Sequence, residues 1–370
     1  MLTSLDDTLW HQLPTTFDHV GTSDPRFFDR YWFALYAPDG SAAAQITMGA
    51  YRNMDVLDGA AVVVYGGKQH NVRVSRPLGA GMDTKCGPLS VDIIQPLQKF
   101  GLHIDAGAHM RGEITWDGIA PAHEEQPHFK RVRGRVVEDY QRFDQIGTAS
   151  GWLELEGKRV DVNQWWACRD HSWGVRPRIG VREPVTGEAE PLDERGFTMA
   201  FLFFSTDAHA GHVLLSKREG EPSYTTGVVR DLNSGETLSV KDLQLEATLH
   251  AGTRRFQVAT LTARLEGGTD FVLRSEAIGS AIAMQGLGYS GGYDDRKGLG
   301  VWRGPNRIET DVWDVSSPSK IVYPGGSANE HWHRIQPVAV HARLGTSPES
   351  RGTGSMTLIL SGRIPRLGLE

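Results

Sequence analysis

The feature that most constrains the fold is a series of short β-like runs, separated by turn residues, along most of the chain. Residues 30–36 (RYWFALY) are rich in aromatic side chains and end at Ala-Pro-Asp-Gly, a strong turn signal. Further runs of this kind cover residues 60–65, 132–137, 151–155, 197–204, 256–265 and 356–360. Many short strands with turn chemistry between them predict a sandwich or a barrel.

Helical patterns are scarce, and we expect two roughly equal β-rich halves. Residues 90–100 are interrupted by Pro96, and no capped amphipathic repeat appears. The 370 residues suggest two domains or one large one. The polar segment Arg182–Arg195 (REPVTGEAEPLDER) holds two prolines and no apolar periodicity, so we expect a loop there between two β-rich halves.

Composition excludes several classes of protein. The chain has 39 basic and 45 acidic residues, which gives no reason to expect a nucleic-acid-binding face. Cys86 and Cys168 lie far apart, which argues against a disulfide scaffold and a thiolate zinc site. No basic stretch followed by an apolar run opens the chain, and no run of eighteen apolar residues occurs. We therefore expect a cytoplasmic protein without a membrane span.

The segment Gln164–Gly174 (QWWACRDHSWG) concentrates three tryptophans, an arginine, a carboxylic acid and an imidazole. In an extended strand, side chains alternate between two faces. One face carries Trp166, Cys168 and Asp170, and the other carries Trp165, Arg169 and His171. Burial of Asp170 among aromatic rings inside a barrel would raise its pKa and let it donate a proton. Aromatic faces would then stabilise a carbocation formed from an alkene.

Two other interpretations of this segment apply. Aromatic clusters usually pack cores, and an Arg-Asp-His run can close a domain with a buried hydrogen-bond network. A hydrolase triad is excluded, because Asp170, His171 and Ser172 are adjacent and a triad brings together separated positions.

Asp170–Gly174 (DHSWG) resembles the D-H-x-W-G signature of the carotenoid 1,2-hydratase (hydroxyneurosporene synthase) and AttH-like superfamily. Residues 288–304 (GYSGGYDDRKGLGVWRG) resemble a Gly- and Asp-rich run near the end of uncharacterised members. The resemblance implies tandem lipocalin-like barrels, with the first motif near their junction and its Asp or His facing a cavity. It also implies that Asp170 is the acid that protonates a double bond, with His171 and Trp173 shaping its site.

The pattern and the resemblance together predict an all-β protein of two consecutive lipocalin-like antiparallel β-barrels. We expect an N-terminal barrel at residues 1–178 and a C-terminal barrel at residues 179–370, meeting near residues 175–195.

Several weaker signals have simpler explanations. Residues 286–291 spell G-x-G-x-x-G, but the polar run that follows cannot open an apolar-faced helix, so we expect a loop. His331 and His333 have the spacing of a zinc pair without a clear third ligand, and we expect no metal. The alternating segment Arg131–Arg135 (RVRGR) is typical of a solvent-facing strand, and aromatic residues at 27–33 are expected to fill a core.

We expect a cofactor-independent hydratase, dehydratase, isomerase or cyclase acting on a hydrophobic alkene or alcohol such as a terpenoid, steroid or polyketide. The expected catalytic residues are Asp170 and His171. The expected substrate-binding residues are Trp165, Trp166, Arg169, Trp173, Tyr293, Asp294 and Trp302. The alternatives are a lipid or steroid carrier of the same fold and an interaction protein with solid barrels. We expect a monomer or a homodimer.

Overall fold

The computed structural model describes residues 2, 4–7, 9, 11, 13–80, 83–132, 134–180, 195–330 and 333–370. The expected all-β fold is confirmed, with 62% of residues in strands and 4% in helices. Helical structure in these ranges consists of short 3₁₀ turns: η1 (Ser4–Asp7), η2 (Arg52–Met54), η3 (Met284–Leu287), η4 (Tyr289–Gly291) and η5 (Pro365–Leu367). No helix within them has the length and hydropathy that a membrane crossing needs.

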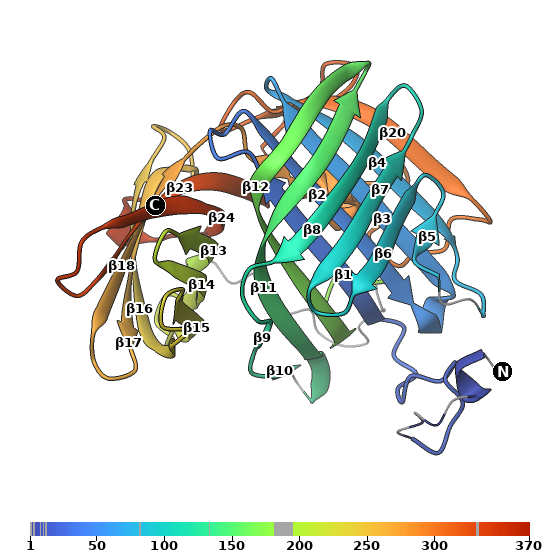
Figure 1. Cartoon of the computed structure of the whole chain (residues 1–370), viewed down its shortest axis with the longest axis horizontal. Coiled ribbons are helices and arrows are strands. Elements are labelled where there is room, and N and C mark those ends of the chain that lie inside the picture. The colour runs from blue at the N-terminus through green and yellow to red at the C-terminus, as the bar shows by residue number, and fades with distance from the viewer. Residues whose placement is uncertain are drawn as a thin grey trace.

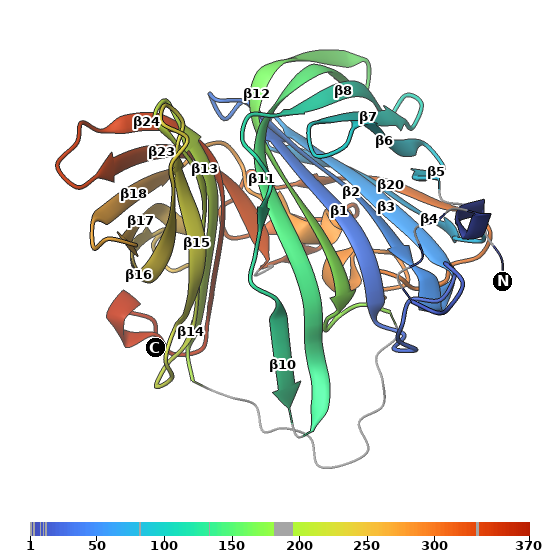
Figure 2. The ribbon, with the colours of Figure 1, turned by 60° about the horizontal axis from the view of Figure 1, so that its bottom comes forward.

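The N-terminal unit is one large antiparallel sheet that curls around an apolar core (Figures 1 and 2). Its strands from the first part of the chain are β1 (Phe27–Tyr36), β2 (Ala42–Tyr51), β3 (Val56–Tyr65), β4 (Lys68–Pro77), β5 (Lys85–Cys86), β6 (Leu89–Gln95), β7 (Lys99–Asp105), β8 (Met110–Gly118), β9 (His123–Glu124), β10 (His128–Val132), β11 (Arg135–Leu155) and β12 (Lys158–Val175). Strands β1–β4 form a meander, and β12 pairs with β1 on one side and β11 on the other.

The C-terminal unit is a closed eight-stranded barrel. Its strands are β13 (Phe197–Thr206), β14 (His209–Arg218), β15 (Tyr224–Asp231), β16 (Thr237–Leu249), β17 (Phe256–Leu265), β18 (Asp270–Ala277), β23 (Arg334–Leu344) and β24 (Ser350–Ser361), with the short β19 (Ile282–Ala283) on β23. Pairing of β18 with β23 closes the ring, whereas β15 and β16 pair only where Val228–Arg230 meets Thr237–Ser239.

The chain returns to the N-terminal sheet before it completes the barrel. Strand β20 (Arg307–Asp314) pairs along its whole length with β4, and β21 (Ile321–Val322) and β22 (Ala328–Asn329) extend the same sheet. The units lie side by side, with the chain termini at opposite ends of the molecule (Figure 1). The division at residues 178 and 179 stays a prediction, and the predicted seam 182–195 lies outside the described residues except for Arg195.

A second apolar cluster lies between the two units. It joins outward-facing side chains of β1–β3 and β12 to the C-terminal barrel and to the segment around η3, as Trp32, Val62, Trp166, Phe203 and Met284 show. Strands β11 and β12 lie on the side of the sheet that faces the barrel (Figure 2). The face alternation expected for residues 165–171 places Trp165 and Ala167 in the inner core and Trp166 and Cys168 in this interface.

Two local expectations have clear outcomes. Residues 286–291 form 3₁₀ turns and a loop, as expected. The continuous strand expected through residues 132–137 is wrong, because Val132 pairs with Arg135 and the chain turns back between β10 and β11. Gly134 takes φ +81° in this turn, a conformation that glycine adopts at little cost.

Candidate functional site

A cluster of buried and partly buried ionisable side chains lies where the two units meet, and we call it the junction cluster. It consists of Glu125, Arg142, Asp144, Asp170 and His212. Asp144 on β11 is directly opposite Asp170 on β12, so the two carboxyl groups leave the sheet on the same face. The C-terminal barrel contributes His212 from β14, and Glu125 follows β9.

Glu125 is the anion of the junction cluster. Its two oxygens accept hydrogen bonds of 2.8 and 2.6 Å from Nη2 of Arg142, and one lies 2.7 Å from Nε2 of His128. Burial acts to raise the pKa of Glu125, but Arg142 and the hydrogen bonds outweigh it and hold that pKa well below its usual range. The guanidinium of Arg142 also lies 4.9 Å from the ring centre of Phe201, so the ion pair is fixed from both units.

Asp144, in contrast to Glu125, keeps its proton. Burial and the charge of Glu125 raise its pKa well above the usual range, and the Arg142 Nε atom stays 3.8 Å from its carboxyl. Neither of its oxygens accepts a hydrogen bond from a donor within the described ranges, and a hydrogen bond with the Glu125 carboxyl also raises its pKa. Ionising a second carboxyl group beside a charged one is costly in a dry site, so in the resting state Glu125 takes the charge and Asp144 keeps a proton.

His212 is a buried imidazole that stays neutral. Burial lowers its pKa to about 4, despite the nearby Glu125 carboxylate. Its Nε2 atom lies 3.6 Å from Oδ2 of Asp144 and 3.9 Å from Oε1 of Glu125, and no described residue forms a hydrogen bond with it. A protonated acid and a neutral base therefore face one another across the junction of the units.

A cavity of about 90 Å³ opens on these groups. His123, Asp144 and His212 form part of its wall, and both units contribute to it. Its remaining lining is Ala120, Pro121, Ala122, Gln145, Ile146, Ala210, Gly211, Val228, Arg230 and Thr237. We call it the junction cavity. It has apolar walls, a polar end and an acid–base pair, which together suit proton transfer to a small apolar group.

Three side chains of the junction cluster have the atom types of metal ligands. Glu125, Asp144 and His212 place one ligand atom each within 4.8 Å of one another. However, Arg142 already holds both oxygens of Glu125, so a second cation would compete with a guanidinium inside the same cluster. The residues fit proton transfer better than metal binding. The predicted pair His331 and His333 falls partly outside the described residues.

The structure separates the two residues predicted to be catalytic. Asp170 lies on the face of the junction cluster, where burial raises its pKa against the opposing charges of Arg142 and Arg176. His171 lies on the other face, with Nε2 2.7 Å from Oδ1 of Asp29 and its ring against Tyr31. The expectation that Asp170 points into a barrel is wrong, because the period of two sends Trp165 and Ala167 to the inner core instead.

The other predicted residues of this segment divide in the same way. Arg169 is buried inside the N-terminal sheet, with its guanidinium 4.4 Å from the ring centre of Phe100 and Nε donating to Gln145 Oε1 at 2.9 Å. Trp165 packs in the inner core and Trp166 in the interface. Trp173 is half-exposed beside His171. None of these four lines the junction cavity.

The predicted residues of the second motif lie on the outer face of β3, β4 and β20. Tyr293 is buried and donates to the carbonyl of Val74 at 3.1 Å, beneath the guanidinium of Arg303. Asp294 pairs with Arg307 at the surface, and Trp302 is exposed. Their roles in substrate binding stay predictions.

Sequence reasoning missed Glu125, Arg142, Asp144 and His212. Arg142 and Asp144 are two positions apart in an extended run, which places them on one face. His212 is a single imidazole in the otherwise small and apolar run Ala210–Leu215. No local signal connects these residues, because they come together only through β11, β12 and the packing of β14.

Comparisons with known proteins give a family and a fold. The model of a family described as "Family of unknown function (DUF8625)" matches residues 2–369. None of the curated proteins matches the chain. The crystal structure of CghA aligns with a TM-score of 0.52 at 10% identity, covering 91% of this chain and 89% of that one. The crystal structure of CghA with Sch210972 gives a TM-score of 0.50 at the same identity and coverage. These values show a shared fold.

Proposed function

The chain belongs to DUF8625, a family of unknown function, and we propose that it is a cofactor-independent acid–base enzyme acting at the junction of its two β units. The observation that carries the proposal is the pairing of Asp144 with His212. One is a carboxyl that keeps its proton, the other is an imidazole that stays neutral, and both face one cavity.

Hydration of an alkene is the reaction that this pair suits best. Asp144 donates its proton to one alkene carbon, and the π electron pair forms the new C–H bond. Water then adds to the resulting cation while His212 accepts one of its protons. Transfer of that proton from His212 to Asp144 restores the starting state, so alkene and water give an alcohol. Dehydration follows the same steps in reverse, and loss of a proton from another carbon gives an isomer.

The surrounding residues tune this chemistry. Glu125 remains ionised beside Arg142, which keeps the proton on Asp144, and its negative charge favours a cation formed nearby. Asp170 is a second carboxyl group nearby, and its charge would raise the pKa of Asp144 further. We keep the predicted catalytic role of Asp170 as part of the proposal. General acid–base transfer typically contributes ~10²–10⁴-fold in rate, and a dry site strengthens the electrostatic interactions.

The size of the cavity limits the substrate. About 90 Å³ accommodates the reacting end of a molecule, next to apolar groups such as Ile146, Ala210 and Val228. We therefore propose a hydrophobic alkene or alcohol, of the terpenoid, steroid or polyketide type, that inserts one end. The fold shared with CghA, which has been crystallised with Sch210972, supports a ligand site in a double unit of this kind.

The test uses a panel of terpenoids, steroids and phenolic alkenes in H₂¹⁸O, with products followed by mass spectrometry. Wild type is compared with Asp144→Asn and His212→Gln, and with Asp139→Asn as a control on an exposed position of the same strand. We expect ¹⁸O in a product of wild type and of the control, and a rate lower by ~10²-fold or more in the other two.

Other outcomes would change the assignment. If Asp170→Asn abolishes turnover while Asp144→Asn does not, the acid is Asp170. Equal binding of a ligand by all variants, with no ligand converted, would reject catalysis and favour a carrier.

A further inference from the structure

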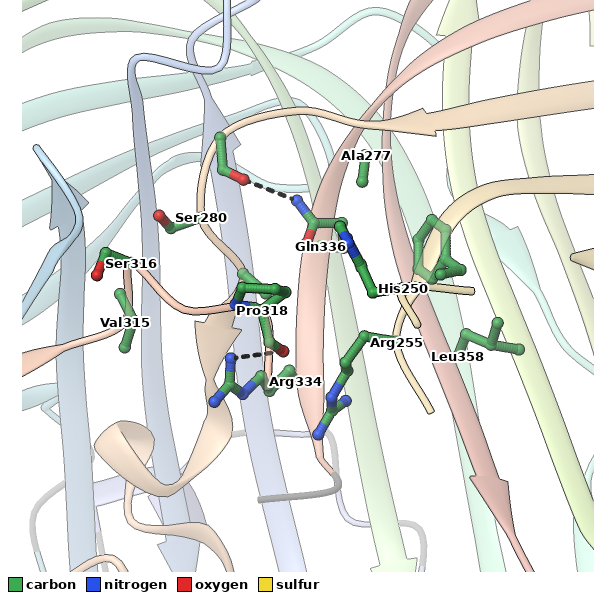
Figure 3. Close-up of a pocket in the computed structure, with 13 residues that line it drawn as sticks. His250, Arg255, Ala277, Ser280, Val315, Ser316, Pro318, Arg334, Gln336 and Leu358 are labelled. Atoms are coloured by element: carbon green, nitrogen blue, oxygen red, sulfur yellow. Dashed lines mark hydrogen bonds between the residues drawn. The ribbon is translucent and has the colours of Figure 1, made fainter. Parts of the chain in front are cut away.

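A second cavity lies between the C-terminal barrel and the segments that lead to and from the N-terminal sheet (Figure 3). Its volume is about 230 Å³, and it shares no lining residue with the junction cavity. Arg255 comes before β17, Arg334 and Gln336 lie at the start of β23, and Ser316 follows β20. This cavity is therefore separate from the site of the proposed function.

Arg334 is the unusual residue in this cavity. It is only 3% exposed, and its Nη1 atom donates to the carbonyls of Ser317 at 3.0 Å and Pro318 at 3.2 Å. Its Nε and Nη2 atoms are buried and have no hydrogen-bond partner in the described part of the chain. A guanidinium offers five N–H donors, and leaving the three on these two nitrogen atoms unmatched away from water is costly. Two donors of one planar fork thus remain available for a ligand.

The surroundings of Arg334 are cationic. Arg255 and His250 line the same cavity, and both arginine side chains extend toward the same end of it in Figure 3. Burial and the charge of Arg255 lower the pKa of Arg334 to about 10, and burial lowers that of Arg255 to about 10. The exposed Glu330 is the acidic group that acts on both arginines. An anion in the cavity would relieve the repulsion and occupy the free fork.

Part of the wall is apolar. Phe256, Ala277, Val315 and Leu358 line the cavity beside the arginines. A neighbouring hollow of about 380 Å³ shares Arg255 and Leu358 with it, so there is room for the body of a ligand. A free phosphate has no apolar surface to bury against these side chains, whereas an organic acid would bury its apolar part against them.

We propose that this cavity binds a hydrophobic carboxylate, with its anionic head on Arg334 and Arg255 and its apolar body against Phe256 and Leu358. The guanidinium fork matches the planar carboxylate in a bidentate geometry.

Isothermal titration calorimetry of the full chain tests the proposal, with 4-phenylbutyrate as the probe, 4-phenylbutan-1-ol as its neutral counterpart and inorganic phosphate as the anion without an apolar body. We expect saturable binding of the acid by wild type, weakened about 10-fold or more in Arg334→Gln and in Arg255→Gln. The control Arg351→Gln, at an exposed arginine, is expected to bind as wild type does.

Circular dichroism checks the fold of each variant, because Arg334 also anchors Ser317 and Pro318. If Arg334→Gln fails to fold, Arg255→Gln alone decides. The proposal is overturned if wild type does not bind the acid, if the alcohol binds equally well, or if a folded Arg255→Gln binds unchanged. Phosphate binding as tight as that of the acid would also reject the assignment of a hydrophobic carboxylate.

Discussion

At the scale of single residues, identical functional groups take opposite charge states according to their contacts. Glu125 and Asp144 are both buried carboxyl groups, but only Glu125 accepts hydrogen bonds, on both of its oxygens, from Nη2 of Arg142. Burial and the neighbouring Glu125 anion raise the pKa of Asp144, and the more distant Arg142 does not offset them. The acid of the proposed reaction is therefore chosen by the geometry of one guanidinium, not by residue type.

The buried imidazole of His212 predicts a pH dependence of stability. Its pKa in the folded state is about 4, below the value of about 6.5 expected in the unfolded chain. The unfolded state then binds more protons at acid pH, so this contribution to stability is complete above pH ~6.5 and is lost as the pH falls toward 4. The full loss is on the order of 3 kcal/mol.

Urea unfolding at several pH values measures this loss. We expect His212→Gln to reduce the fall in unfolding free energy between pH ~6.5 and ~4 relative to wild type. His19→Gln, at an exposed histidine, is the control and is expected to follow wild type. Parallel pH profiles for wild type and His212→Gln would contradict the prediction.

At the scale of elements, β12 serves two sites because its side chains alternate. Asp170 faces the C-terminal barrel and His171 lies on the opposite face beside Tyr31, so neighbours in sequence belong to separate environments. The signature DHSWG ends at Gly174, which takes φ +132° where β12 pairs with Tyr140 of β11. A Cβ atom there would lie 2.3 Å from the carbonyl oxygen of Asp139 and 2.6 Å from Cα of Tyr140.

This close approach predicts that Gly174 tolerates no side chain. The clash is with backbone atoms of the partner strand, which cannot move without breaking the ladder that holds Asp144 opposite Asp170. We expect Gly174→Ala to lower the unfolding free energy by about 2–4 kcal/mol in urea titrations. Gly107→Ala is the control, since φ is also positive there but no atom lies within 4 Å of the added Cβ. Equal losses in the two variants would mean that strain, not the clash, sets the cost.

At the scale of the whole molecule, a buried ion pair connects the N-terminal sheet to the returning chain. Arg30 on β1 donates to Asp58 at 2.9 Å, Tyr51 at 2.7 Å and Thr47 at 2.7 Å. The backbone N–H of Gly300 donates to the other oxygen of Asp58 at 2.7 Å. A stretch of chain from the C-terminal half is therefore held by the meander β1–β3, and β20 follows it onto β4.

This arrangement predicts that one change at the ion pair destabilises both units. Arg30→Met leaves the Asp58 carboxylate buried and unpaired, with an expected loss of about 3–5 kcal/mol in unfolding free energy. The double variant Arg30→Met/Asp58→Leu is expected to be less destabilised than the single one, because no lone charge remains. Calorimetry is the measurement, and we expect a single transition at lower temperature. Two separate transitions would show that the units unfold independently.

Much of this architecture follows from local chemistry that is visible in the sequence. Turn residues and short apolar runs predict β1 and β17, because strand propensity and turn conformation depend on neighbouring residues. The period of two likewise separates Asp170 from His171 correctly. The turn at Gly134 is missed because charged and small or apolar residues alternate through residues 131–135, as they do in a continuous strand.

The junction cluster was decided by tertiary structure alone. Asp144 meets Asp170 through the β11–β12 ladder, and His212 reaches them only when the C-terminal barrel packs on the interface formed by residues such as Trp166 and Phe203. Burial sets the charge state of each group. It results from that packing, so the residues nearby in the chain do not reveal it. The sequence therefore predicts strands and their faces, whereas the acid and the base of the site exist only in the assembled fold.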